Sequence, residues 1–394
     1  MIERISFQVP ARGRAISLGL MVLGAAAAAF GLYSDPKRTW PSLLLNGFYF
    51  AALALISVFF LASQRLAGSR WSASLRRIPE ALMSAMPAAA ILVLVLFFGR
   101  NDLFPWADHD KVFHDAPAIA GKVQYLQMPY VFARLALAVV LWCIFAWLFR
   151  KLSREQDQNP SANMEYHRRL NMFAPIFVII FAISFTLFVY DFIISLDPRW
   201  FSTMFGVYLF AGTFVNGICA VTFAVVLLRE QGLLRNWVSE DQLHDLGKMV
   251  FAFSTFWAYI WTCQYLLIWY SNIPEEVSHY TTRTIGPWLP LFVVNFLVNW
   301  ILPFTVLMSA ANKRKPKVLL FVTSVLFVGH WLDLYMQIMP SYWSSPKFGP
   351  VELLVPLGYA GLFYFMFVNS LAQAPLVPVN DPILAANLLQ QHAH

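Results

Sequence analysis

The chain has 394 residues, of which 59% are hydrophobic and only 12% are charged. Soluble globular proteins carry about 25% charged residues, so this composition excludes that class. The net charge of +7 is concentrated in short loops between apolar segments, which indicates membrane-topology signals rather than a nucleic-acid-binding patch.

Ten apolar segments follow one another along the chain, and each has the roughly 20 residues that a bilayer-crossing helix needs. Their length excludes the short alternating strands of a membrane β-barrel. In lipid, backbone amides must be satisfied within each segment, so we expect helices. The sequence therefore predicts an all-α integral membrane protein of about ten transmembrane helices, at 15–33, 41–63, 78–99, 126–149, 171–195, 200–228, 246–270, 287–310, 317–339 and 352–373.

The distribution of basic residues predicts the orientation. If the N-terminus lies in the cytoplasm, 19 of the 28 Lys and Arg residues fall in cytoplasmic segments and 8 in the opposite loops. This bias follows the positive-inside rule and places both termini in the cytoplasm. The first segment begins like a secretory signal, but we expect it to remain as a helix, with Gly24 and Ala28 spaced for close packing.

Two aspartates occupy matching places in segments five and nine. Asp191 and Asp333 are each followed by a proline seven residues later and by an aromatic residue nine residues later. Both segments run in the same direction, so we expect two parallel four-helix bundles with one extra helix at each end. The corresponding divisions are an N-terminal peripheral helix at 1–40, a first bundle at 41–199, a second bundle at 200–343, and a last helix with a cytoplasmic tail at 344–394.

The two aspartates are the strongest functional candidates, because a charged side chain at a membrane-helix centre costs roughly 2.5–3.5 kcal/mol on insertion scales and usually serves a function. His330 lies three residues before Asp333 on the same helical face. We expect these two side chains to hydrogen-bond and to exchange a proton. Tyr190 and Tyr335 lie beside the acids and extend the candidate proton path. The alternative is that each carboxylate only binds a neighbouring helix.

Charged residues at the inner helix ends form a second group of candidates. Ser239 and Gln242 fit a capping box at the start of segment seven. Charges are common at membrane interfaces, so a purely structural role is the alternative to a functional one. The functional hypothesis is a proton-uptake site formed by His244, Asp245, Lys248 and Glu80.

Polar side chains inside segments four and seven are further candidates. The guanidinium of Arg134 can extend outward to the interface or pair with a carboxylate such as that of Asp191. Tyr259, Gln264 and Tyr265 can bind a quinone carbonyl, although an aromatic stripe more often serves packing. Both alternatives remain open in each case.

The sequence contains no pattern for a redox centre. Cys143, Cys219 and Cys263 lack the spacing of a metal or iron–sulfur ligand set. A transmembrane b-type haem needs two facing histidines, and only His330 lies well inside a segment. P-loop, dinucleotide-binding and nucleophile-elbow motifs are missing. We therefore expect no metal and no directly bound cofactor, and we do not expect catalysis by this chain alone.

Three stretches lie at the ends of segments five to seven: residues 196–208 (LDPRWFSTMFGVY), 244–248 (HDLGK) and 264–276 (QYLLIWYSNIPEE). They resemble the ActF-type membrane subunits of bacterial alternative complex III, within the wider NrfD/polysulfide-reductase membrane-subunit family. The resemblance covers most of the chain, and the third stretch is the most specific. In that family, two four-helix bundles are flanked by two further helices.

The resemblance implies a subunit of a quinol:cytochrome c or quinol:oxidase oxidoreductase in the bacterial inner membrane. The implied partners are a sister ten-helix quinol subunit, an iron–sulfur protein and a multihaem cytochrome c, with a terminal oxidase as a further partner. Menaquinol or ubiquinol would be the substrate of the complex, and lipids would surround this chain. The resemblance also suggests a proton path through Asp191, His330, Asp333, His244, Asp245 and Lys248.

Two other functions remain open. The first is a quinol-binding subunit with its own site among segments two to five. The second is a proton-coupled secondary transporter, which also uses parallel repeats, although the matching prolines here fall at segment ends. The acidic outer loop at 100–125 is either a solvated loop or a docking surface for an outer subunit; its polar residues are Asp102, Asp108, His109, Asp110, His114 and Asp115.

Overall fold

The structure is a computed structural model that describes residues 5–108 and 121–384. Within these ranges it is helical and contains no β-strand. Nine helical segments of the described chain are long and apolar enough to cross a membrane. A tenth, α10 (Glu240–Ser271), has 32 residues and packs along α9 and α13, but its Trp, Tyr and Gln residues lower its mean hydropathy. The predicted all-α membrane fold of about ten helices is confirmed.

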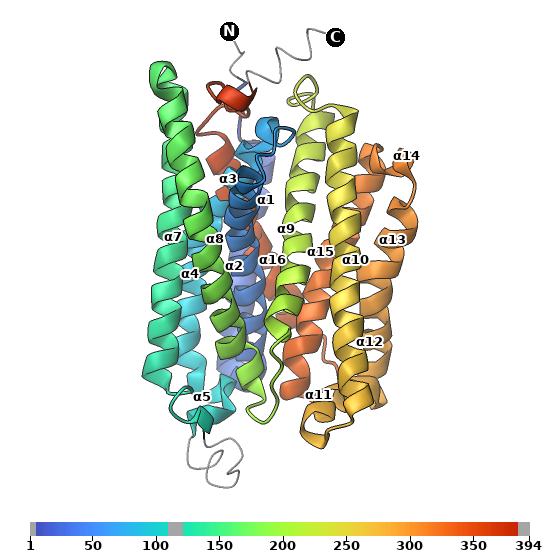
Figure 1. Ribbon diagram of the computed structural model, residues 1–394. Helices are drawn as coiled ribbons and strands as arrows, with labels where there is room; N and C mark the ends of the chain where they lie inside the picture. Colours follow the sequence, from blue (N-terminus) through green and yellow to red (C-terminus); the bar gives the residue numbers. More distant parts are fainter. Residues whose placement is uncertain (1–4, 109–120, 385–394) are drawn as a thin grey trace.

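The first bundle consists of α2, an interrupted third segment, α7 and α8 (Figure 1). Short 3-10 turns break the third segment into three α-helical pieces. Pro87 accounts for the first break, because it cannot donate to the carbonyl of Met83 in η2. The bounds are α2 (Pro36–Leu66), η1 (Ala73–Leu75), α3 (Arg77–Leu82), η2 (Met83–Ala85), α4 (Met86–Leu94), η3 (Val95–Gly99), α5 (Arg100–Leu103), η4 (Pro105–Ala107), α7 (Met128–Gln158), η6 (Pro160–Ala162), α8 (Asn163–Phe192) and η7 (Ile194–Leu196).

The second bundle consists of α9, α10, an interrupted eighth segment and α15. The eighth segment contains a π-helical turn. A short helix that the sequence did not predict, α11, covers one end of the bundle (Figure 1). The bounds are α9 (Phe205–Glu230), α11 (Pro274–Thr284), η8 (Gly286–Trp288), α12 (Leu289–Phe296), η9 (Leu297–Ile301, the π turn), α13 (Leu302–Leu307), α14 (Ala310–Lys313), α15 (Pro316–Ile338) and η10 (Met339–Ser341).

The two extra helices, α1 (Ala11–Ser34) and α16 (Pro350–Leu371), pack against each other and against α2 beside the first bundle (Figure 1). Their contact depends on glycines. A Cβ added to Gly24 would lie 2.4 Å from the Cα of Gly358, so neither position has room for a side chain. Gly24 thus serves the close packing that its spacing with Ala28 suggested.

The two bundles meet along α2, which contacts α8, α9 and α15. Polar side chains of α2 tie it to α15 across this interface. The Trp331 indole N–H donates to the Asn46 side-chain oxygen at 3.0 Å, and the Tyr49 hydroxyl donates to the Phe327 carbonyl at 2.9 Å. The bundles therefore share one continuous core.

The first helix begins and the last helix ends at the end of the molecule where α14 also lies, whereas α5 and α11 lie at the opposite end (Figure 1). Residues 372–384 fold back over the α14 end, where the Leu376 amide donates to the Ile5 carbonyl at 2.9 Å. Both α8 and α15 run toward the α5 and α11 end. Asp191 and Asp333 lie in the halves of these helices nearer that end, as their register predicted. Of the acidic outer loop, His109, Asp110, His114 and Asp115 lie outside the described residues.

Candidate functional site

All four segments of the second bundle meet at the carboxylate of Asp333. Its Oδ1 accepts hydrogen bonds from the Tyr208 hydroxyl of α9 and from the Asn295 amide of α12, the latter at 2.8 Å. Its Oδ2 accepts from the Trp257 indole of α10 at 3.1 Å. We call these four residues the Asp333 cluster. Each is at most 3% exposed, so the carboxyl group is separated from both solvent and lipid.

The Asp333 cluster contains no cation. A buried carboxylate normally pairs with Lys or Arg, since burying an unpaired charge is costly. Here the donors to the carboxylate are a phenol, an amide and an indole. The Gln337 amide, also neutral, donates to the Tyr208 hydroxyl at 3.0 Å. These donors stabilise the ionised form by hydrogen bonding, but none supplies a compensating charge. Among the described residues, the carboxylate of Asp333 therefore has hydrogen-bond partners but no ion-pair partner.

The prediction that His330 hydrogen-bonds to Asp333 is wrong. Neither ring nitrogen of His330 has a hydrogen-bond partner in the described protein, although the residue is only 5% exposed. The ring stands edge-on to Trp257, with centroids 5.8 Å apart. The donors to the carboxylate come instead from three other helices, α9, α10 and α12.

His330 and Asp333 instead line a common cavity of about 20 Å³ at the interface between the bundles. A volume of that size holds about one water molecule. Gly212 of α9 makes the space possible, because a Cβ there would lie 3.3 Å from the His330 Nδ1. Two polar residues, Tyr49 and Asn216, line the cavity from α2 and α9 and hydrogen-bond to each other at 3.1 Å. A water there would connect His330 and Asp333 to this pair.

The π turn of the eighth segment positions the amide of Asn295. Asn299, four residues later, donates to the side-chain oxygen of Asn295 at 2.7 Å and to the Gly329 carbonyl of α15 at 3.0 Å. A Cβ on Gly329 would lie 2.4 Å from the Asn299 side-chain oxygen, so this close approach requires glycine. Single π turns inside α-helices are frequent at functional sites.

Asp191, the counterpart of Asp333, has a different partner. The Arg134 guanidinium of α7 donates to both carboxylate oxygens at 2.9 Å. The same guanidinium donates to the Tyr125 carbonyl at 3.1 Å and lies over the Tyr125 ring at 4.1 Å. Of the two alternatives for Arg134, the structure thus contains the ion pair. The contact ties α8 to α7.

The two tyrosines beside the aspartates bind loops. The Tyr190 hydroxyl donates to the Thr203 carbonyl at 3.0 Å, in the link between the bundles. The Tyr335 hydroxyl donates to the Lys347 carbonyl at 2.7 Å and accepts from the Lys347 amide at 3.0 Å. Neither hydroxyl joins the Asp333 cluster.

The inner charged residues do not form one site. Lys248 pairs with Asp245 at 2.6 Å on the partly exposed surface of α10, beside His244. Glu80 lies on α3, where it accepts from the Arg77 guanidinium and from the Ser153 hydroxyl, each at 2.6 Å. Among the described residues, no contact joins Glu80 to the His244 group. The capping box of Ser239 and Gln242 is confirmed.

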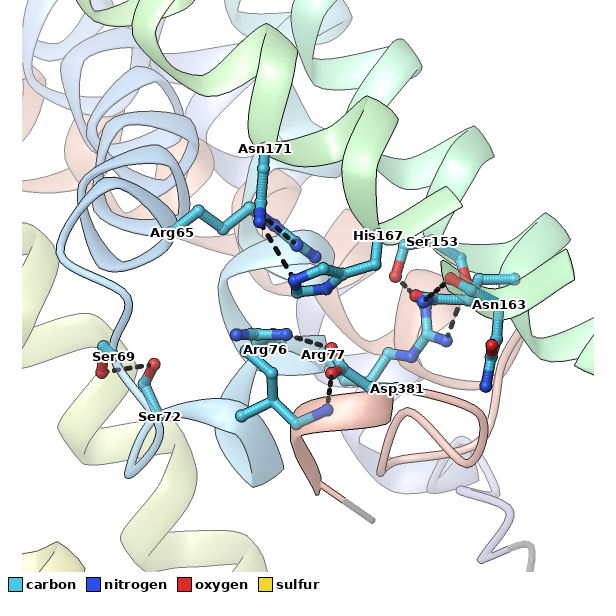
Figure 2. A network of polar contacts seen from close by, with 12 residues as sticks. Arg65, Ser69, Ser72, Arg76, Arg77, Ser153, Asn163, His167, Asn171 and Asp381 are labelled. Atoms are coloured by element: carbon cyan, nitrogen blue, oxygen red, sulfur yellow. Dashed lines mark hydrogen bonds and ion pairs between the residues drawn. The ribbon is translucent and has the colours of Figure 1, made fainter. Parts of the chain in front are cut away.

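Glu80 belongs to a network that holds residues 380–381 of the C-terminal segment against α3 and α7. Arg76 faces Asp381 of the C-terminal segment and forms an ion pair with it (Figure 2). Arg77 pairs with Asp157 at the end of α7, and the Asn380 amide donates to the Asp157 carbonyl at 2.8 Å. This buried network connects α3, α7 and the C-terminal segment, which indicates a structural role.

At the α5 and α11 end, His279 and Arg283 of α11 close the second bundle. The Arg283 guanidinium donates to the carbonyls of Met336 and Gln337 at 2.8 and 3.0 Å, at the C-terminal end of α15. His279 stacks on Trp200, with ring centroids 4.0 Å apart. Burial, assisted by the charge of Arg283, holds the pKa of His279 well below its usual range. The ring is therefore neutral at physiological pH.

Comparison with known proteins gives no family assignment: no protein-family model matches this sequence, and no curated protein matches it. The site must be interpreted from its own geometry. Sequence reasoning found Asp333 but missed its partners Tyr208, Trp257 and Asn295. The available signal was the pair Asn295 and Asn299, spaced by one helical turn inside an apolar segment.

Proposed function

We propose that this protein is an integral membrane subunit of a quinol-oxidising respiratory complex of the alternative complex III type, related to the ActF-type subunits. It would lie in the bacterial inner membrane with both termini in the cytoplasm. It would support quinol oxidation by its partners and move protons through the Asp333 cluster. The three family-like stretches, at 196–208, 244–248 and 264–276, support the class of complex.

One observation carries the proton-moving role. Asp333 is a buried carboxyl group with neutral hydrogen-bond donors and no cation, and it shares a cavity with His330, whose ring nitrogens have no protein partner. A carboxyl group in this setting can change protonation without breaking an ion pair. Asp191 differs in this respect, because its carboxylate is paired with the Arg134 guanidinium.

Affinity purification from native membranes tests the class of complex. We expect an iron–sulfur protein, a multihaem cytochrome c and a second ten-helix subunit to co-purify with this chain, and the preparation to oxidise menaquinol or ubiquinol. Purification of the chain alone from gently solubilised membranes, with no haem absorbance in the preparation, would contradict the proposal.

The alternative of a proton-coupled secondary transporter is favoured by one observation. The eighth segment is interrupted at the π turn beside Asp333, and transporters commonly bind substrates at interrupted helices near the bilayer midplane. Solute uptake by the purified chain in proteoliposomes, driven by a proton gradient, would support this function in place of the first.

A further inference from the structure

A small polar pocket lies near the C-terminal ends of α7 and α16, beside α3 of the first bundle. Its volume of about 10 Å³ admits about one oxygen atom, so only part of a larger ligand can enter it. Four segments contribute to its walls, through Arg77 and Glu80 of α3, Arg150 and Arg154 of α7, Ser370 of α16 and Ala374 of the C-terminal segment.

The carboxylate that lines the pocket already has a cationic partner. Glu80 accepts from the Arg77 guanidinium at 2.6 Å, and Arg77 also pairs with Asp157. Within the described residues, neither Arg150 nor Arg154 forms an ion pair; each donates to a neutral oxygen instead. Two carboxylates thus face three guanidinium groups, which leaves positive charge at the pocket.

The two unpaired arginines keep hydrogen-bond donors available. Nη2 of Arg150 donates to the Ser370 hydroxyl at 2.9 Å, and Nη2 of Arg154 donates to the Gln373 side-chain oxygen at 3.0 Å. Nε of Arg150 is buried and has no partner among the described residues. A guanidinium carries more N–H donors than these contacts use. The neutral acceptors therefore hold both side chains in place and leave donors for a bound anion.

An apolar stripe continues along the segment that carries Arg77 and Glu80. Its exposed residues recur at intervals of about one helical turn, and they are Pro87, Ile91, Val95 and Phe98. The helix α4, which begins this stripe, packs against α7. On α7, Trp147 is 57% exposed and the Lys151 ammonium lies 4.7 Å from the centre of its ring. Such residues are typical of the membrane interface, so the pocket lies at the level of lipid head groups.

We propose that this pocket binds the phosphodiester group of an anionic phospholipid of the phosphatidylglycerol type. One phosphoryl oxygen enters the pocket and accepts from Arg150 and Arg154, and the acyl chains lie along the apolar stripe beside α7. Basic pockets between membrane helices suit anionic head groups. A choline or ethanolamine head group would bring its own cation toward the guanidinium groups. Inorganic phosphate shares the oxyanion chemistry but gains nothing from the apolar stripe.

Native mass spectrometry of the full chain in neutral detergent micelles tests the proposal. Palmitoyl-oleoyl-phosphatidylglycerol is titrated into the micelles, and phosphatidylcholine with the same acyl chains is the reference lipid. We expect one phosphatidylglycerol per chain to bind about tenfold more tightly than phosphatidylcholine. Arg150→Gln and Arg154→Gln should each weaken phosphatidylglycerol binding about five- to tenfold, because each removes a hydrogen bond to a charged group.

Two further variants distinguish the pocket from general surface charge. Arg169→Gln removes one positive charge near the start of α8, where Arg169 is exposed and pairs with Glu165 outside the pocket. This matched control should bind phosphatidylglycerol like the wild type. Ala374→Trp retains every charge but fills the pocket, so it should weaken binding as much as the arginine variants do.

Equal affinities of the wild type for the two lipids would overturn the proposal. So would unchanged phosphatidylglycerol binding in all three pocket variants. An equal loss in Arg169→Gln and in the pocket arginine variants would also overturn it, because the lipid would then respond to the basic surface as a whole. Inorganic phosphate at millimolar concentration should leave the lipid bound; its displacement by phosphate would make the pocket a free-anion site. None of these results depends on whether redox partners co-purify.

Discussion

The ion pair between Arg134 and Asp191 should couple the stability of α7 to that of α8. The carboxylate is 3% exposed and the guanidinium 26%, and two hydrogen bonds of 2.9 Å join them. In Asp191→Asn, the Arg134 charge remains without an anionic partner. Breaking a fully buried pair costs about 3–5 kcal/mol, and because Arg134 is partly exposed we expect a loss of about 2–3 kcal/mol in the free energy of unfolding.

The other two variants of the double-mutant cycle separate the free energy of the ion pair from the contribution of each side chain alone. Arg134→Met should cost about 1–2 kcal/mol, because it removes both hydrogen bonds to the Asp191 carboxylate. The double variant removes both charges and should lie within about 1 kcal/mol of the wild type. The resulting coupling free energy is about 2 kcal/mol or more.

Unfolding in mixed detergent micelles, monitored by circular dichroism, measures these free energies. The matched control is the Lys151–Glu155 pair on the same helix, which is exposed at 3.8 Å and should show a coupling below about 0.5 kcal/mol. If the Arg134–Asp191 coupling equals that of the control, or if the double variant is less stable than both single variants, Asp191 is not fixed by this ion pair and its distinction from Asp333 fails.

Two further predictions concern helix contacts and pH. Gly24→Ala should lower the free energy of unfolding by about 1–3 kcal/mol, because the new Cβ meets the Gly358 backbone. Gly19→Ala on the same helix has open space and should leave stability unchanged. Unfolding in micelles measures both values, and equal losses would contradict the contact. The pKa of His279 is lowered in the folded chain, so near pH 6.5 the unfolded chain binds a proton that the folded chain does not. The free energy of unfolding should therefore fall as the pH drops below 6.5, by at most about 1.4 kcal/mol per pH unit. His279→Phe should remove that part of the pH dependence, and a slope equal to that of the wild type between pH 7 and 5 would contradict the assignment.

Much of the fold could be predicted from the apolar segments, because a membrane-crossing helix needs length and hydrophobicity that are visible in the sequence. The ten expected segments correspond to observed helices or interrupted helices. The short helix α11 was missed because it has 11 residues and is polar, so it carries no membrane signal. The π turn at Leu297–Ile301 was missed because it depends on hydrogen bonds to α15, which sequence spacing does not reveal.

The candidate site could be predicted only in part. The register of Asp191 and Asp333 gave two equivalent positions, but equivalence along the chain does not determine which side chain faces each carboxylate. Arg134 meets the first, and neutral donors from three helices meet the second. The spacing of His330 and Asp333 predicted contact within one helix, and the packing of the other helices of the bundle decided otherwise.

The central claim is that Asp333 moves protons and Asp191 does not. The number of protons transferred per electron, measured during quinol oxidation by the purified complex in proteoliposomes, tests it most directly. Replacement by Asn keeps the size of the side chain and removes its exchangeable carboxyl proton. We predict that Asp333→Asn lowers the ratio while Asp191→Asn, in the fraction that remains assembled, keeps it. A wild-type ratio in Asp333→Asn would contradict the account.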